Sequence, residues 1–386
     1  MKRIFAMMAL LLAAVSFNSC DHKQGDDVGL NADFYITSDK DVIKSDGVDK
    51  ARIIVYLQGK DVTADAIIYD ADFNPVTLED GCFATTTQGA YKFCAYYGTY
   101  STYNRNYEDN GLYTINAIPY DVPQPAEDTA PANLDFVHRA FLTQYPGTGC
   151  GYCPYMTKII KSIAAEGVIP AKAVIAAAHS GYNSNDPAAI NRPKVSNYPY
   201  LHVDLVNGFT HNNGADVLKA LIDQSIAPKA KAGIAVNSVL YREAKKLVVT
   251  VSVKAAEAGL YNVGAWLLED DIYARQDDYD NQGEHGVEDV ENSYDYHDNC
   301  VRIVDSDYMG TFFGRLIGNM KAGETVEKTF VMDLKIDNGK KSDWVTEKLH
   351  LAVFVSNGQK SGSKISYSVC NAVDCKINKE YSFEYR

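Results

Sequence analysis

Gln144-Tyr145-Pro146-Gly147-Thr148-Gly149-Cys150-Gly151-Tyr152-Cys153-Pro154 decides the predicted fold, because it sets two cysteines two residues apart where a strand gives way to a helix. Residues 139–143 before the motif read as a strand, and residues 150–165 carry an apolar stripe at helical spacing. Free N–H groups and the helix dipole stabilise a thiolate at a helix N-terminus. A second cysteine one turn later can resolve a mixed disulfide. The pattern predicts a redox dithiol, with Cys150 as the nucleophile and Cys153 as the resolving thiol.

The residues around the dithiol would adjust its chemistry. Gly151 and Tyr152 stand between the cysteines and are predicted to tune the thiols, and Pro154 is tolerated in a first helical turn that has no use for its missing N–H. Pro199 precedes a predicted strand over residues 201–206, and a cis bond there would set its ring against the sulfurs. The alternatives for the cysteines are half of a zinc site, a permanently closed structural disulfide or two inert thiols. The alternative for the proline is an ordinary loop residue.

The sequence around the motif alternates strands with helices. Residues 173–178 form a short buried strand by length and composition, and residues 215–226 read as a closing helix. A Cys-x-x-Cys motif in such a pattern is typical of a thioredoxin-like domain. We therefore predict a central thioredoxin-like α/β domain over residues 133–228, preceded by a linker over residues 124–132.

Strand patterns dominate on both sides of that segment. Residues 32–123 carry short β-branched runs between turn residues, which predicts an immunoglobulin-like β-sandwich. Residues 229–386 return to β patterns and predict a second sandwich, with an acidic insertion over residues 269–299. The predicted fold class is multidomain α+β, with an N-terminal immunoglobulin-like β-sandwich, a central thioredoxin-like α/β domain and a C-terminal β-sandwich.

The first residues carry an export signature. The basic start Met1-Lys2-Arg3 leads to an apolar run over residues 4–17, which is too short to span a bilayer. Cys20 follows small polar residues, which predicts a lipoprotein signal peptide over residues 1–19, acylation of Cys20 and a polar tether over residues 20–31. The predicted membrane contact is with the lipid bilayer through the acylated cysteine. An ordinary secretory signal with an incidental cysteine is the alternative.

Charge and cysteine usage narrow the function classes. Asp and Glu number 50 against 37 Lys and Arg, and the resulting charge of −13 offers no electrostatic footprint for nucleic acid. No Walker loop, dinucleotide fingerprint or Gly-x-Ser-x-Gly elbow is present, so no cofactor or metal is predicted. Seven cysteines remain besides the acylated one, so at least one thiol is unpaired in the monomer. Bridges from Cys82 to Cys94, from Cys370 to Cys375, or from Cys300 to either of the last two stay open.

The dithiol segment, residues 144–154, resembles that of the Bacteroidetes outer membrane protein twenty-eight related lipoproteins. The resemblance extends to Gly59-Lys60-Asp61-Val62-Thr63 and Gly89-Ala90-Tyr91. It also includes Tyr294-Asp295-Tyr296-His297-Asp298-Asn299-Cys300-Val301-Arg302, where the family carries a His-rich run ending in Arg. The resemblance implies a lipid-anchored protein of the outer membrane, periplasmic or surface-exposed, with a thioredoxin-like domain before a β-sandwich.

Two positions depart from the redox pattern. The family carries an acidic residue six positions before the first cysteine, where this chain has Gln144. Thioredoxins use a buried carboxylate there for proton transfer when the second thiol attacks, and glutamine cannot act as a base. Thioredoxins also carry Trp before the first cysteine, where this chain has Gly149. The glutamine therefore disfavours efficient reduction.

Three weaker signals have local explanations. The spacing from Asp278 to Asp289 loosely follows a calcium loop, but no helix flanks it, and a solvated acidic insertion is favoured. His179 could approach the dithiol and lower a thiol pKa, although a locally bonded strand-end histidine is commoner. An aromatic tract could stack on sugars or a partner, or only cover a sandwich face. It comprises Tyr96, Tyr97, Tyr100, Tyr103 and Tyr107.

Two functions from different classes stay open. In the first, Cys150 attacks a protein or small-molecule disulfide, Cys153 resolves it and Pro199 holds the extended substrate, as in a thiol-disulfide oxidoreductase. In the second, the chain is a non-catalytic outer-membrane lipoprotein that binds a ligand or an envelope protein partner through its β-sandwich domains. The complete dithiol favours the first by a narrow margin, whereas Gln144 and the large sandwiches favour the second.

Overall fold

The computed structural model describes residues 34–105, 110–179, 186–189, 195, 197–279, 294–304, 313–334, 344–361 and 364–386. Most of the regular structure in these residues is β-strand. The chain divides into two compact units, Met1–Pro119 and Tyr120–Arg386. Among the described residues, no helix is long and apolar enough to cross a membrane.

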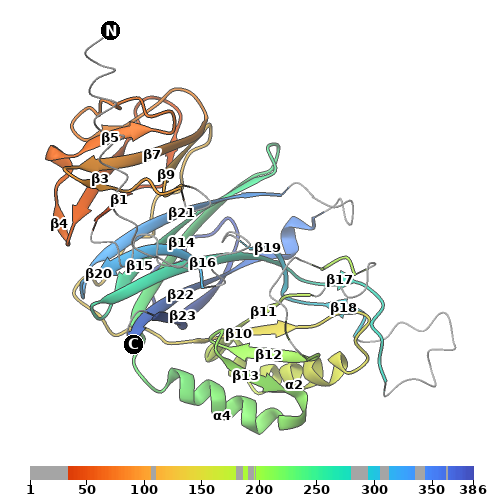
Figure 1. The fold of residues 1–386 in the computed structure, drawn as a ribbon. Coiled ribbons are helices and arrows are strands. Elements are labelled where there is room, and N and C mark those ends of the chain that lie inside the picture. The colour runs from red at the N-terminus through yellow and green to blue at the C-terminus, as the bar shows by residue number, and fades with distance from the viewer. Residues whose placement is uncertain are drawn as a thin grey trace, which may run out of the picture. The chain divides into compact units, whose positions relative to one another are not determined.

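The first unit is a pair of sheets around one core (Figure 1). One sheet runs β1-β3-β4 with β6 beside β3, and the other runs β2-β9-β7-β5 with β8 beside β7. Alternating burial along the strands brings Ile36 and Ile53 of the first sheet into one core with Phe93 and Ile115 of the second. The elements are β1 Phe34–Ser38, β2 Val42–Lys44, β3 Ala51–Leu57, β4 Lys60–Asp61, η2 Thr63–Asp65, β5 Ile67–Asp70, β6 Cys82–Phe83, β7 Gly89–Tyr97, β8 Tyr100–Ser101 and β9 Tyr113–Ile118.

The second unit is built on a nine-stranded sheet of order β13-β12-β10-β11-β19-β16-β22-β23, with β20 beside β16. A three-stranded sheet, β14-β15-β21, and a two-stranded sheet, β17-β18, accompany it. The first helical part comprises β10 Ala140–Tyr145, α2 Cys153–Ala165, α3 Val168–Ala171, β11 Ala173–Ala177, β12 Tyr200–Val203, β13 Asn207–Thr210, η3 His211–Asn213 and α4 Ala215–Ile226. The remainder comprises β14 Ala232–Tyr241, β15 Lys246–Ala255, β16 Gly259–Glu269, β17 Ile272–Tyr273, β18 Tyr296–His297, β19 Cys300–Val304, β20 Arg315–Met320, β21 Thr325–Asp333, η4 Thr346–Lys348, β22 Leu349–Ser361 and β23 Lys364–Lys376.

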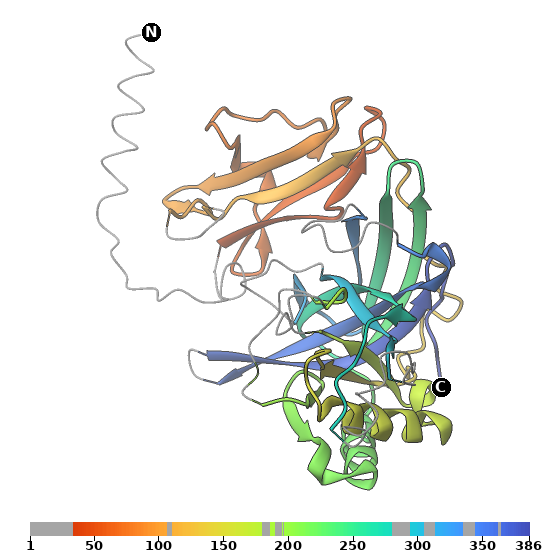
Figure 2. The same ribbon diagram turned by 90° about the vertical axis from the view of Figure 1, so that its right-hand side faces the viewer.

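The helices cover one face of strands β10 to β13. Leu142 and Ile175 of the strands share a core with Met156 of α2 and Leu218 of α4. Figures 1 and 2 both show α2 and α4 together beside these strands. The spacing of Met156, Ile160 and Ile163 gives α2 its apolar stripe. Burial of that stripe therefore fixes the helix on the sheet and sets the position of its first turn.

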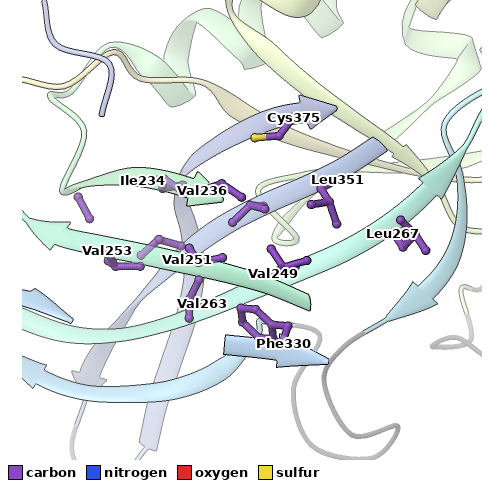
Figure 3. Packing of buried hydrophobic residues seen from close by; sticks show 14 of the residues in the cluster. Ile234, Val236, Val249, Val251, Val253, Val263, Leu267, Phe330, Leu351 and Cys375 are labelled. Atoms are coloured by element: carbon purple, nitrogen blue, oxygen red, sulfur yellow. The ribbon is translucent and has the colours of Figure 1, made fainter. Parts of the chain in front are cut away.

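The other face of the same strands is covered by C-terminal strands. Phe141 of β10 lies 4.7 Å from the Phe354 ring of β22 and 5.3 Å from the Trp266 ring of β16, measured between ring centroids. The opposite side of β16 and β22 packs against the three-stranded sheet, as Figure 3 shows for Val263, Leu351 and Phe330. Strands β16 and β22 are thus buried on both faces.

The predicted multidomain α+β fold class is wrong. Residues 133–228 do not form a separate thioredoxin-like α/β domain, because β11 pairs in parallel with β19 through Ala177 and Cys300 and joins the C-terminal strands in one sheet. A thioredoxin-like core would need helices on both faces, whereas one face of this sheet packs on strands. The chain is mostly β-sheet, arranged in several sheets.

Replacing Trp266 with Ala tests this shared core. The ring is fully buried, and its loss is expected to lower the free energy of unfolding by about 3–5 kcal/mol. Urea unfolding combined with hydrogen exchange is the measurement, and protection should fall in α2 as well as in β22. Tyr273→Ala, at a 56% exposed ring, is the control and should change stability little. An α2 that keeps its protection in the Trp266 variant would contradict a shared core.

Candidate functional site

The two cysteines of the motif are joined in a disulfide at the start of α2. The Cα atoms of Cys150 and Cys153 lie 5.4 Å apart, and the N–H of Cys153 donates to the Cys150 carbonyl at 2.9 Å. Helix α2 begins at Cys153, three residues later than predicted, and Pro154 lies in its first turn, where no N–H is needed. Cys150 is half-buried and Cys153 is 1% exposed. Cys150 is therefore the more exposed of the two cysteines.

Gln144 lies on β10, and Pro199 directly precedes β12, which pairs with β10. The Tyr198–Pro199 bond is cis, and the next residue, Tyr200, pairs with Tyr145 at the end of β10. Residues 146–153, which connect β10 to α2, are named the disulfide loop. Gln144 is buried on β10, and its Nε2 donates to Thr157 Oγ1 of α2 at 3.4 Å. A neutral amide therefore stands at the end of the strand that leads to the disulfide.

A segment far along the chain lies against the disulfide loop. Burial alternates from Ile272 to Tyr279, which is typical of an extended strand. The N–H of Asp277 donates to the Thr148 carbonyl at 2.8 Å, and the N–H of Tyr279 donates to the Gly151 carbonyl at 3.0 Å. We name Gln276–Tyr279 the covering segment. The sequence predicted only a polar insertion here, because nothing in its pattern points to the cysteines.

The side chain of Gln276 holds the loop by its backbone. Its Nε2 lies 3.3, 3.1 and 3.0 Å from the carbonyl oxygens of Gly147, Thr148 and Cys150 and 2.9 Å from that of Asp277, and these acceptors share its two N–H groups. Gln276 is 4% exposed, so these bonds form away from water. One buried amide therefore contacts most of the turn that carries the disulfide.

Gly151 and Tyr152 meet the covering segment directly. A Cβ atom on Gly151 would lie 2.5 Å from the Tyr279 ring, so the close approach of this ring requires glycine. The Tyr152 ring meets Tyr279 edge-on at 4.8 Å and stacks on His211 at 5.9 Å. The structure therefore gives Gly151 a steric role, whereas the predicted tuning of the thiols by these residues stays a prediction.

Three buried side chains, Asp186, His179 and Cys300, form an array that contacts the disulfide loop at Thr148. Asp186 Oδ2 accepts from the Thr148 N–H at 3.2 Å and from His179 Nδ1 at 2.9 Å. His179 Nε2 lies 3.6 Å from Cys300 Sγ, and all three side chains are at most 1% exposed. His179 is therefore satisfied locally, which is the second of its two predicted roles.

The protonation of this array follows from its burial. Burial, reinforced by the charge of Asp186, raises the pKa of the Cys300 thiol well above its usual range, so Sγ keeps its proton. The thiol donates to the His297 carbonyl at 3.5 Å. Burial opposes ionisation of Asp186, but the hydrogen bonds from His179, Ala188 and Thr148 outweigh it and lower the pKa of this carboxyl. The array is thus an anchor for the loop with an ionised carboxylate at one end.

The remaining predicted features fall outside a common site. Among the described residues, the cysteines outside the motif are free thiols: Cys82, Cys94, Cys300, Cys370 and Cys375. Burial raises the pKa of the Cys94 thiol to about 11. Cys20 and most of the calcium-like spacing from Asp278 to Asp289 lie outside the described residues. Within the described part of the chain, no group of three His, Cys, Asp or Glu side chains could hold a metal ion.

The comparison with known families gives the class of the protein. A family model described as outer membrane protein Omp28 matches residues 188–380, half of the chain, which places it among outer-membrane proteins. The chain belongs to the Omp28 family. The matched residues include the covering segment, whereas Cys150 and Cys153 lie outside them.

One solved structure resembles this chain. HBP35 of Porphyromonas gingivalis is similar over 63% of this chain and 76% of that chain, with 15% sequence identity and a TM-score of 0.48. A likeness at this level carries no argument about function. No curated protein matches the sequence.

Asp186→Asn tests the anchor behind the loop. The amide cannot replace both carboxylate oxygens as acceptors, so the free energy of unfolding should fall by about 2–4 kcal/mol. Urea denaturation is the measurement. Asp223→Asn is the control, because Asp223 pairs with Lys172 on the surface and should lose about 0.5 kcal/mol. Equal losses in the two variants would contradict the anchoring role.

Proposed function

We propose that this outer-membrane protein acts in the cell envelope as a non-catalytic binding protein, with the Cys150–Cys153 disulfide as a structural bridge. The observation that carries this proposal is the covering segment, which lies on the disulfide loop through the backbone N–H groups of Asp277 and Tyr279 and the side-chain amide of Gln276. Acylation of Cys20 would attach the chain to the lipid bilayer.

Thiol-disulfide exchange requires access to a sulfur atom and a base, and the disulfide loop restricts the first and lacks the second. A thiolate must approach a disulfide sulfur directly, and the second thiol must then lose its proton to attack the mixed disulfide. Cys153 is 1% exposed, the covering segment lies on the loop that carries Cys150, and Gln144 supplies no base. These three features oppose turnover.

The binding surface proposed for the first unit is its aromatic face. Tyr100 is 44% exposed and Phe73 is 39% exposed, and each ring contacts another: Tyr100 lies 5.8 Å from Phe34, and Phe73 lies 4.8 Å from Tyr103. Exposed aromatic rings that are held by neighbours give binding area at low entropic cost. An envelope protein partner fits such a face. Tyr107 of the predicted tract lies outside the described residues.

A thiol-disulfide oxidoreductase is the second candidate function. Its specific support is the half-buried Cys150, three residues before the start of α2, because free N–H groups at a helix N-terminus stabilise a nearby thiolate. In this case Cys150 would attack protein or small-molecule disulfides, Cys153 would resolve them and Pro199 would hold the substrate. The two candidates predict different redox midpoints for the pair.

A redox titration of the full-length protein separates the two functions. In glutathione and dithiothreitol buffers, with alkylation and mass spectrometry of the Cys150–Cys153 pair, a structural bridge should stay closed below about −300 mV. A reversible midpoint between about −120 and −270 mV would overturn the non-catalytic proposal and support the oxidoreductase. The free cysteines of the described residues, four of them buried, are alkylated in denaturant after the quench and serve as the internal standard.

Site-specific photo-crosslinking tests the aromatic face. A photoreactive phenylalanine analogue at Tyr100 should give one discrete protein adduct in intact cells, because this position lies in the proposed contact. The same analogue at Val48, which is 78% exposed in the same unit, is the control and should give little. Equal labelling at both positions, or none at Tyr100, would contradict binding through this face.

A further inference from the structure

The contacts between the disulfide loop and the covering segment have the form of peptide recognition. Asp277 and Tyr279, two residues apart, donate their backbone N–H groups to the loop at 2.8 and 3.0 Å. Burial alternates along the same residues, as in a strand laid on a surface. Extended peptides bind to exposed backbone in this way, with main-chain bonds for affinity and alternate side chains for specificity.

Two side chains supply the specificity. Gln276 is buried, and its two N–H groups are within hydrogen-bond distance of three carbonyls of the loop. Tyr279 lies on the flat surface that Gly151 leaves open, with the Tyr152 ring at its edge. A carboxylate at position 276 would face the same carbonyls and be repelled, and a β-branched side chain at 279 would lose the ring contact.

We propose that the disulfide loop is a docking site for an extended peptide with glutamine followed three residues later by an aromatic residue, and that the chain fills the site with its own Gln276–Tyr279. The inference deepens the proposed function, since it names the contact that keeps the bridge closed. The loop retains a thiol exchange reaction that the covering segment suppresses.

The suppressed reaction is ordinary exchange with a dithiol reductant. A reductant thiolate attacks Cys150 Sγ, a new S–S bond forms, the Cys150–Cys153 bond breaks, and Cys153 leaves as a thiolate that takes up a proton. The second thiol of the reductant then attacks the mixed disulfide and releases Cys150. The reductant ends as a cyclic disulfide, and the protein gains two electrons and two protons.

The test is the rate of reduction by dithiothreitol. In the full-length protein carrying Gln276→Ala and Tyr279→Ala, the second-order rate constant should rise at least about tenfold, the factor that corresponds to the loss of one or two net hydrogen bonds from a closed state. Quenched alkylation and mass spectrometry follow the Cys150–Cys153 pair. The controls are Tyr279→Phe, which keeps the ring, and Tyr273→Ala, which lies three residues before the covering segment. Both should react like the parent.

Gly151→Ala tests the same contact from the other partner. Its methyl group would occupy the position of the Tyr279 ring, so it should raise the rate by a similar factor without any change in the covering segment. Circular dichroism and thermal unfolding establish that each variant keeps the parent fold. Parent-like rates in both the double variant and Gly151→Ala would overturn the proposal.

An added peptide tests docking itself. The synthetic peptide Ile-Tyr-Ala-Arg-Gln-Asp-Asp-Tyr, the sequence of residues 272–279, should slow the reduction of the double variant in a saturable manner. The same peptide with alanine in place of its glutamine and its last tyrosine should not. Equal effects of the two peptides would overturn the docking site. The docking tests compare rates of reduction, whereas the redox titration of the parent measures an equilibrium midpoint. Either result can therefore contradict its own proposal while the other proposal is still supported.

Discussion

Phe141, Trp266 and Phe354 pack ring against ring between two sets of strands, and the arrangement of the second unit depends on this contact. The three rings bury one face of β10 and β11 under β16 and β22. Helices α2 and α4 are therefore confined to the other face. The same packing joins the strand that leads into the disulfide loop to the C-terminal part of the chain, from which the covering segment comes.

The disulfide loop is held from two sides by groups of opposite character. On one side, neutral donors of the covering segment bind its carbonyls. On the other, the ionised Asp186 accepts its Thr148 N–H. Since both the donors and the acceptors of a tight turn are satisfied by protein, little of its polar backbone is left for water or for a substrate. The backbone of the loop is thus hydrogen-bonded to protein as in a core element, although Cys150 is half-buried.

Local signals in the sequence predicted local structure well. Helix α4 spans the predicted residues 215–226, and β11 lies within the predicted residues 173–178, because helical periodicity and short buried runs depend on neighbours in the chain. The same patterns indicate that a face is buried but not which residues cover it, so the sequence around Phe141 did not predict its contact with Trp266. Gln276 was equally hidden, since a buried amide in an acidic stretch has no periodic signature. Gly151 was assigned to thiol chemistry, whereas its place is set by the Tyr279 ring.

The parallel pairing of Ala177 with Cys300 has a consequence for how the chain is made. The ribosome produces β10 to β13 and both helices well before β19 and β22, which cover their second face. Closing so long a loop is slow, because its entropy is lost before the pairing is gained. Until the C-terminal strands arrive, Phe141 and Val174 present an uncovered apolar surface. The nascent chain therefore passes through a stage at which chaperones are needed to cover this apolar surface. Its folding is completed only after synthesis is nearly finished.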